Sequence, residues 1–248
     1  MKRLTCLCCA LGLSLAGRSN CGWRIADCGL GTRSFGLSNP QSAIRHPQVA
    51  SLTIGRLHYD GGGDWYSGPS KLVNLLGAIR QRTRLAVGDR ERVVTLTSPG
   101  LWDVPYLYMT GHGNVRFAAE EVPILRRYLE QGGFLHADDD YGMDKSFRRE
   151  IARVFPDRPL VEVPLTHPIY HVPYEFPKGL PKIHEHDGLP AQGFGIFLGD
   201  RLVVYYSYQT DLGDGWEDPE VHHDTPELHE AALRMGVNLF TYAVSSTR

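Results

Sequence analysis

The fold of this chain is decided by two stretches, Pro105-Tyr-Leu-Tyr-Met-Thr-Gly-His-Gly113 and Gly132-Gly-Phe-Leu-His-Ala-Asp-Asp-Asp-Tyr-Gly142. Each contains an apolar run with the length of a buried strand, and each run ends abruptly in glycine and polar residues. In a parallel α/β sheet, the carboxyl ends of the strands open onto one crevice, where such sheets bind ligands. The two stretches therefore predict a site at one edge of a sheet, without naming its chemistry.

Predicted helices and strands alternate around these two runs. Helices are predicted at 69–82, 120–131 and 145–155, and further strands at 50–57, 93–96 and 160–163. The second helix stops at Gly132-Gly133, and Asp144 is the candidate N-cap of the third. This alternation predicts an α/β fold with a doubly wound, mainly parallel sheet.

The carboxyl-terminal part of the chain predicts a β-hairpin followed by a helix. Residues 194–198 and 202–208 form its two strands, joined by Gly199-Asp200 as a two-residue turn. Thr225-Pro226 then opens a helix that extends to about Val244, with proline at the first helical position.

The first 48 residues are predicted to lie outside the folded domain, which occupies 49–248. Lys2 and Arg3 precede the apolar stretch 4–16, as in a secretory signal peptide, so residues 1–17 are expected to direct export to the periplasm or cell envelope. A buried first strand or helix is the alternative. Residues 18–48 are expected to be a disordered linker, or to reflect a misassigned translation start.

Composition excludes several classes of function. The formal net charge is -2, so the chain has no basic field for nucleic acid. All five cysteines lie at positions 6–28, which leaves no thiol nucleophile in the folded part. After the amino terminus, no apolar run reaches the roughly 18 residues that a transmembrane helix needs.

The consecutive aspartates at the end of the second run are the first candidate site. His136 and Asp138 share one face of the predicted strand, whereas Asp139 points the other way or belongs to the turn. Crowded carboxylates raise one another's proton affinity unless a cation balances them. Asp138 and Asp139 are therefore candidate ligands of a hard divalent cation, or candidate catalytic residues together with His112. The alternative is that Asp139 or Asp140 caps the following turn.

His112 lies between two glycines, which allow backbone conformations closed to other residues. Free N–H groups in such a turn can bind an anion, so Gly111 and Gly113 are candidate ligand-binding residues. The alternative is a tight turn whose histidine faces water.

Two loops rich in glycine and acids are expected near the same edge. The loop 60–66 can cover a ligand with its aromatic residues, or can be a plain connection between elements. The loop 211–218 is expected to close over the crevice, with a solvated acidic turn as the alternative. The candidate ligand-binding residues of the two loops are Asp64, Trp65, Tyr66, Asp214 and Trp216.

Histidine pairs give weaker signals. His167 and His171 are four residues apart, as in a zinc-binding helix, but the prolines around them disfavour a helix. His184 and His186 would share a strand face and could chelate a metal, or could be ordinary loop histidines. The segment 222–224 is interpreted as a solvated approach to the last helix.

Four motifs follow one another along the chain: Gly61-Gly-Gly-Asp-Trp-Tyr66, Tyr108-Met-Thr-Gly-His-Gly113, Gly132-Gly-Phe-Leu-x-Ala-Asp-Asp139 and Asp211-Leu-Gly-Asp-Gly-Trp-Glu217. Together they resemble the bacterial family called domain of unknown function 4159, over roughly residues 51–244. The resemblance implies a fold similar to class I glutamine amidotransferases, a flavodoxin-like sheet with helices on both faces. It also implies secretion or attachment to envelope proteins. No activity is established for the family, so it implies no catalytic residues.

Amidotransferases of this kind carry a cysteine at the sharp turn after a central strand. Here the comparable strand, 134–137, ends in Asp138-Asp139, and the absence of a later cysteine excludes glutamine hydrolysis through a thioester. We therefore expect an exported domain that binds an unidentified small molecule, glycan or envelope protein at the strand edge. The alternative is a hydrolase that uses Asp138 or Asp139 with His112. A divalent metal ion is the candidate cofactor.

Overall fold

The computed structural model of the protein describes residues 51–246. These residues form one compact unit. The predicted signal peptide and linker lie outside the described residues. No helix among the described residues is both long and apolar enough to cross a membrane.

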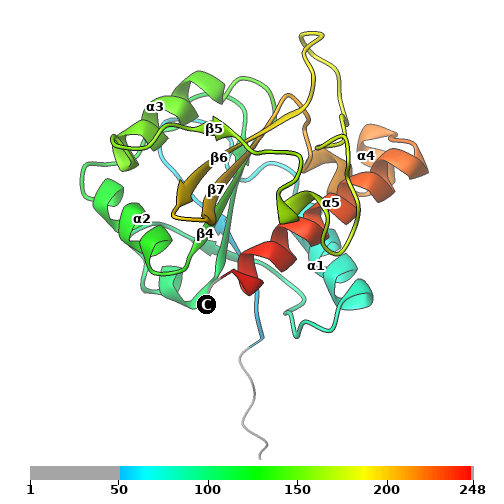
Figure 1. Cartoon of the computed structure of the whole chain (residues 1–248), viewed down its shortest axis with the longest axis horizontal. Helices are drawn as coiled ribbons and strands as arrows, with labels where there is room; N and C mark the ends of the chain where they lie inside the picture. The colour runs from blue at the N-terminus through cyan, green and yellow to red at the C-terminus, as the bar shows by residue number, and fades with distance from the viewer. Residues whose placement is uncertain (1–50, 247–248) are drawn as a thin grey trace, which may run out of the picture. The chain divides into compact units, whose positions relative to one another are not determined.

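A seven-stranded sheet organises this unit, in the order β2-β1-β3-β4-β7-β6-β5 (Figure 1). Its strands are β1 (Ile54–Leu57), β2 (Arg92–Val94), β3 (Tyr106–Gly111), β4 (Phe134–Asp139), β5 (Val161–Glu162), β6 (Gln192–Leu198) and β7 (Arg201–Tyr208). Neighbours among the first five positions pair in parallel, whereas β6 is antiparallel to both β7 and β5. The predicted α/β class with a mainly parallel sheet is confirmed.

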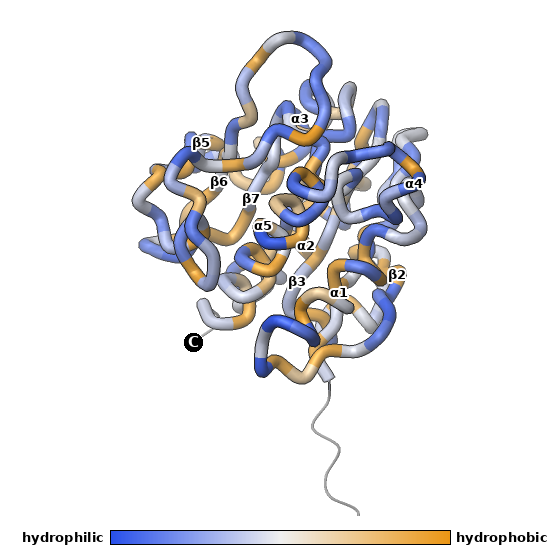
Figure 2. Tube along the Cα trace, turned by 90° about the vertical axis from the view of Figure 1, so that its right-hand side faces the viewer, coloured by the Kyte–Doolittle hydropathy of each residue, from blue (hydrophilic) through white to orange (hydrophobic). Residues whose placement is uncertain are grey.

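Helices pack on both sides of this sheet, over two separate buried cores. They are α1 (Lys71–Arg82), α2 (Glu121–Glu130), α3 (Asp144–Val154), the short α4 (Pro219–His222) and α5 (Pro226–Ser245). α1 and α5 contribute to one core, and α2 and α3 contribute to the other (Figure 1). Hydrophobic and hydrophilic residues alternate along α1 and α5 in Figure 2, as expected of helices that bury one side.

The hairpin and the last helix match their predicted patterns closely. β6 and β7 flank the two residues Gly199-Asp200, and the side chain of Thr225 accepts a hydrogen bond from the Leu228 N–H at the start of α5. One predicted cap is wrong. Asp144 is already inside α3, and the carboxylate that accepts the Met143 N–H, at 3.0 Å, is Asp139 at the end of β4.

The register of β3 and β4 brings their ends together. Thr110 pairs with Asp138, and Gly111 pairs with Asp139. Because side chains alternate along a strand, Asp138 faces the α1/α5 core and Asp139 faces the α2/α3 core. The two aspartates therefore leave the same strand end on opposite faces of the sheet.

Candidate functional site

Asp138 is fully buried and accepts three hydrogen bonds from the α1/α5 side. The Gly213 N–H donates to its Oδ2 at 2.6 Å and the Tyr108 hydroxyl donates to the same oxygen at 3.2 Å. The Ser207 hydroxyl donates to Oδ1. Burial, followed by the charge of Asp140, raises the pKa of Asp138 well above its usual value. Its side chain fastens the loop after β7 to β4 and is closed to solvent.

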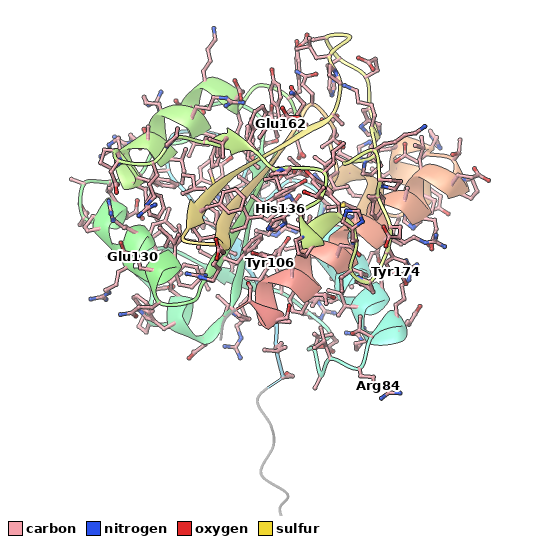
Figure 3. The ribbon with its side chains drawn as sticks, in the orientation of Figure 1. Arg84, Tyr106, Glu130, His136, Glu162 and Tyr174 are labelled. Carbon is pink, nitrogen blue, oxygen red and sulfur yellow. The ribbon has the colours of Figure 1, made fainter. Side chains whose placement is uncertain are left out.

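A buried histidine continues this polar chain toward the middle of the sheet. His136 Nδ1 lies 2.8 Å from the Tyr106 hydroxyl, and its Nε2 lies 2.7 Å from Ser207 Oγ (Figure 3). Burial lowers the pKa of His136 to about 3, so the imidazole is neutral. The pair His136–Ser207 thus joins β4 to β7 without adding charge.

Asp139 lies across the sheet from Asp138. Its Oδ1 accepts the N–H of Met143, the residue before α3, and burial raises the pKa of Asp139 to about 6. This contact corresponds to the alternative given by the sequence, in which Asp139 caps the turn that follows its strand. The structure does not bring Asp138 and Asp139 to one common set of partners.

His112 pairs with the loop after β1. Its backbone N–H donates to Asp64 Oδ1, and its Nδ1 lies 3.0 Å from Asp64 Oδ2. None of the hydrogen bonds and ion pairs in the described part of the chain joins His112 to Asp138 or Asp139. The N–H that the sequence offered for an anion is therefore already bound to a carboxylate of the protein. Catalysis by these three residues stays a prediction.

The aromatic residues of the two predicted loops have different surroundings. Trp65 stacks on His58 with ring centroids 4.1 Å apart, and Tyr66 is 65% exposed beside it. Trp216 is fully buried, and its indole N–H donates to the Ala232 carbonyl of α5 at 2.8 Å. Of these candidate aromatic residues, only Trp65 and Tyr66 are accessible to a ligand, whereas Trp216 belongs to the core.

A buried lysine lies beneath the same edge. Lys71, at the start of α1, places its Nζ 2.7 Å from Asp140 Oδ2 and 2.6 Å from Asp214 Oδ1. Burial alone would lower the pKa of Lys71, but these two carboxylates raise it above its usual value. The ammonium therefore stays charged. Asp140 Oδ1 is buried and has no hydrogen-bond partner among the described residues.

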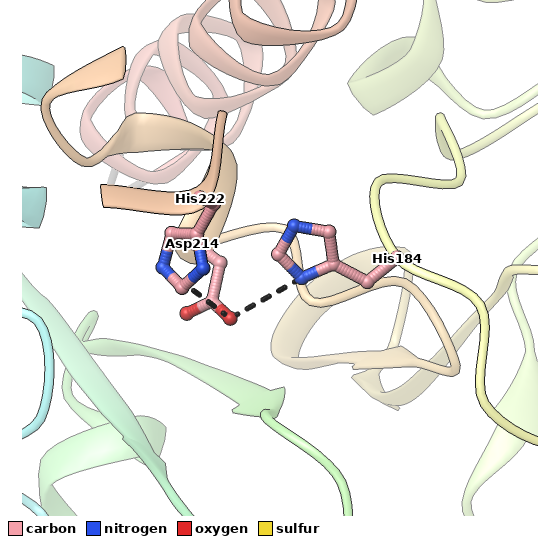
Figure 4. Close-up of side chains that lie close together, drawn as sticks. All are labelled: His184, Asp214 and His222. Carbon is pink, nitrogen blue, oxygen red and sulfur yellow. Dashed lines mark ion pairs between the residues drawn. The ribbon is translucent and has the colours of Figure 1, made fainter. Parts of the chain in front are cut away.

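Asp214 connects this lysine to a histidine. Its Oδ2 lies 3.4 Å from His184 Nδ1, which is also 3.2 Å from Asp211 Oδ2 (Figure 4). The other ring nitrogen, His184 Nε2, lies 3.2 Å from Asp224 Oδ1. The carboxylates of Asp211 and Asp214 raise the pKa of His184 to about 10. Three carboxylates therefore surround one imidazole.

A second histidine faces Asp214 from the end of α4. His222 Nε2 lies 3.8 Å from Asp214 Oδ2 and 3.3 Å from Glu217 Oε1. The rings of His184 and His222 have centroids 4.9 Å apart. One ligand atom from each of His184, Asp214 and His222 falls within 4.8 Å of the others, so these three residues could hold a metal ion.

A cavity of about 480 Å³ opens at the carboxyl ends of β4 and β7. Tyr141 and Gln209 follow those strands with left-handed backbones, φ 72° and 58°. The Tyr141 hydroxyl and the Gln209 amide each donate to Asp187 at 3.0 Å. The lining residues are Asp139, Tyr141, Gly142, Asp144, Lys145, Asp187, Tyr208 and Gln209.

Comparison with known proteins identifies the family. The model of the family described as "Domain of unknown function (DUF4159)" matches residues 53–244. The chain belongs to the DUF4159 family. No curated protein matches the chain. Because the matched region runs from just before β1 into α5, the whole site lies inside the DUF4159 domain.

Sequence reasoning about this DUF4159 domain found only part of the site. It singled out Asp214 and noted His184, but it treated His222 as a solvated residue and did not consider Lys71. Lys71 sits within an ordinary amphipathic helix pattern, so no local signal marks it. His184 and His222 are 38 positions apart (222 minus 184), and only the folded chain brings them to one carboxylate.

Proposed function

We propose that this DUF4159 domain binds a small polar ligand in the cavity at the carboxyl ends of β4 and β7, and that it does so as an exported or cell-envelope protein. The observation that carries the proposal is the conformation of Tyr141 and Gln209. Both are non-glycine residues with positive φ that line the cavity, and Gln209 directly follows β7 while Tyr141 is the second residue after β4. Such backbone conformations cost about 1–3 kcal/mol each and cluster at ligand-binding and catalytic sites.

Binding, rather than covalent catalysis, is supported by the chemistry of the turn after β4. The parallel order β2-β1-β3-β4-β7 is the order of a flavodoxin-like sheet, which supports a relation to amidotransferase-like folds. In those folds the turn after a central strand carries the cysteine. Here Tyr141 and Gly142 have positive φ in that turn, and the hydrogen bond of Tyr141 to Asp187 raises the pKa of its phenol. The phenol therefore stays protonated and acts as a hydrogen-bond donor.

The cavity lining favours a ligand with several hydroxyl groups. Asp144 and Asp187 offer acceptors, Lys145 offers donors, and Tyr208 offers an aromatic ring. Carboxylates beside aromatic rings suit sugars, which present hydroxyl groups and apolar ring faces together. We therefore expect a glycan or a similar polyol rather than an apolar ligand.

The proposal is tested by titrating isotope-labelled protein with glucose and N-acetylglucosamine and following the backbone amides by NMR. We expect shifts at Gly142, Tyr208 and Gln209, and at least tenfold weaker binding in Asp187→Ala. Asp200→Asn, in the exposed hairpin turn, is the matched control and should bind as the unmodified protein does. Shifts confined to a second cavity, whose lining includes Trp102, Tyr128 and Gly133, would contradict the proposal. Turnover of a substrate that is abolished by Asp139→Asn would replace it with the hydrolase.

A further inference from the structure

We propose that His184, Asp214 and His222 form a binding site for a divalent transition-metal ion of the Zn²⁺ class. None of the three residues lines the ligand cavity, so the inference goes beyond the proposed function and does not depend on it. They come from three places: the loop before β6, the 3₁₀ turn Asp214–Trp216, and the end of α4.

The two distances from Asp214 to the imidazoles are close to those in a metal centre, and the same two ring nitrogens also contact Asp211 and Glu217. Ligand atoms about 2.0–2.1 Å from a tetrahedral Zn²⁺ ion lie about 3.3 Å from one another. Asp214 Oδ2 lies 3.4 Å from His184 Nδ1 and 3.8 Å from His222 Nε2. Both separations exceed the usual hydrogen-bond range of about 2.7–3.2 Å. Figure 4 shows both imidazoles beside the carboxylate of Asp214, and the three ligand atoms lie within 4.8 Å of one another.

The surroundings of the three ligands are those of a supported metal site. In protein metal sites, the second nitrogen of a ligating histidine usually donates to a carboxylate or carbonyl. His184 Nε2 lies 3.2 Å from Asp224 Oδ1, so Nδ1 is the ring nitrogen that would bind the ion, in place of its contact with Asp211 Oδ2 at 3.2 Å. Asp214 Oδ1 is held by Lys71 at 2.6 Å, which leaves Oδ2 directed toward the imidazoles. Asp224 and Lys71 are therefore positioning residues.

The local charge favours a cation. Asp214 contacts both imidazoles, Asp211 and Asp224 contact that of His184, and Glu217 contacts that of His222. Among residues 51–246, Lys71 is the one lysine or arginine that forms ion pairs with these carboxylates. A divalent ion would offset this excess of negative charge without a new side chain.

The donor set and the exposure select the ion and give it access. Two imidazoles with one carboxylate suit Zn²⁺ and its neighbours, whereas Mg²⁺ and Ca²⁺ prefer oxygen ligands throughout. The His184 and His222 side chains are 23% and 28% exposed, so an ion can enter from solvent. Glu217 Oε1, 3.3 Å from His222 Nε2, is placed to become a fourth ligand or to orient a bound water.

The test measures Zn²⁺ binding to the full chain by calorimetry in competition with a chelator. The cysteines at positions 6–28 must first be alkylated, because free thiolates bind Zn²⁺ themselves. We expect one Zn²⁺ per chain, with at least tenfold weaker binding in His222→Asn. His223→Asn is the matched control. His223 is the exposed neighbour with φ 58°, a conformation that asparagine tolerates, and its loss should change the affinity less than twofold.

Two further measurements keep the test independent of any single variant. Asp224→Asn should weaken Zn²⁺ binding by about 10–100-fold, as changes to groups that orient metal ligands do. Co²⁺ bound to the unmodified chain should show the intense visible absorption of a four- or five-coordinate site. Equal Zn²⁺ affinity in His222→Asn and His223→Asn, or no Zn²⁺ binding to the alkylated chain at millimolar concentration, would overturn the site. Sugar titrations with EDTA present separate this outcome from failure of the cavity proposal.

Discussion

At the scale of the residue, Lys71 ties the turn after β4 to the loop after β7, because its ammonium contacts both Asp140 and Asp214. Lys71→Met would leave these carboxylates buried without their cation, and breaking a buried pair in this way costs about 3–5 kcal/mol. We expect a loss of that size in the free energy of unfolding, measured by urea denaturation. The control is Lys178→Met at an exposed lysine, which should change it by less than about 0.5 kcal/mol. Similar losses in both variants would contradict the interpretation.

Asp139 makes stability depend on pH. Burial raises its pKa to about 6, whereas the pKa of an aspartate in an unfolded chain is about 3.9. The folded state therefore binds the proton of Asp139 more tightly than the unfolded state does, which adds to the free energy of unfolding at low pH. This added free energy is lost as pH rises from about 4 to about 6, at up to about 1.4 kcal/mol per pH unit. Asp139→Asn should remove that loss, seen as the difference between two profiles of unfolding free energy against pH. Parallel profiles over this interval would show that Asp139 does not titrate as its burial implies.

At the scale of the element, the end of β3 depends on a glycine that cannot be replaced. Gly111 has φ 138°, and a Cβ there would lie 2.5 Å from the Tyr59 hydroxyl and 2.9 Å from Asp64 Oδ1. We expect Gly111→Ala to lower the unfolding free energy by at least about 2 kcal/mol. Gly77→Ala within α1, where the nearest atom would be 3.9 Å away, should instead raise it by about 0.5–1 kcal/mol. The opposite signs are read from thermal unfolding, and a shared sign would refute the argument.

Elements with strong local signals could be predicted from the sequence. β4 was placed from Phe134 onward by its apolar run, and α5 was placed by its capping threonine and first-turn proline. α4 was missed because four residues are too few to show a helical period. The contact of Asp139 with Met143, the residue before α3, was missed because Asp139 lies at the end of β4, five positions before the helix begins (144 minus 139).

At the scale of the whole molecule, the sequence located the edge of the sheet but not the grouping of side chains on it. Parallel strands were expected to bring Asp138 and Gly111 to one edge, and the register of β3 and β4 does so. Because side chains alternate along a strand, Asp138 and Asp139 point to opposite faces of the sheet, although they are adjacent in the sequence. Of the histidines that meet Asp214, His184 comes from a loop and His222 from the four-residue helix α4, and neither segment shows a period in the sequence. Their convergence depends on how the hairpin and α4 pack, and no sequence spacing encodes it.

His186 connects the cavity at this edge of the sheet to the proposed metal site. Its ring stacks on Tyr141 with centroids 4.4 Å apart, and its Nε2 bonds to Asp211, the carboxylate that also holds His184. A ligand in the cavity that rotates the Tyr141 ring would therefore move His186 and, through Asp211, disturb the contacts of His184. An ion that binds His184 would act on Tyr141 through the same residues. Thermodynamic linkage requires such influence to be equal both ways. If a bound sugar changes the affinity of the protein for Zn²⁺ by some factor, bound Zn²⁺ should change the affinity for that sugar by the same factor.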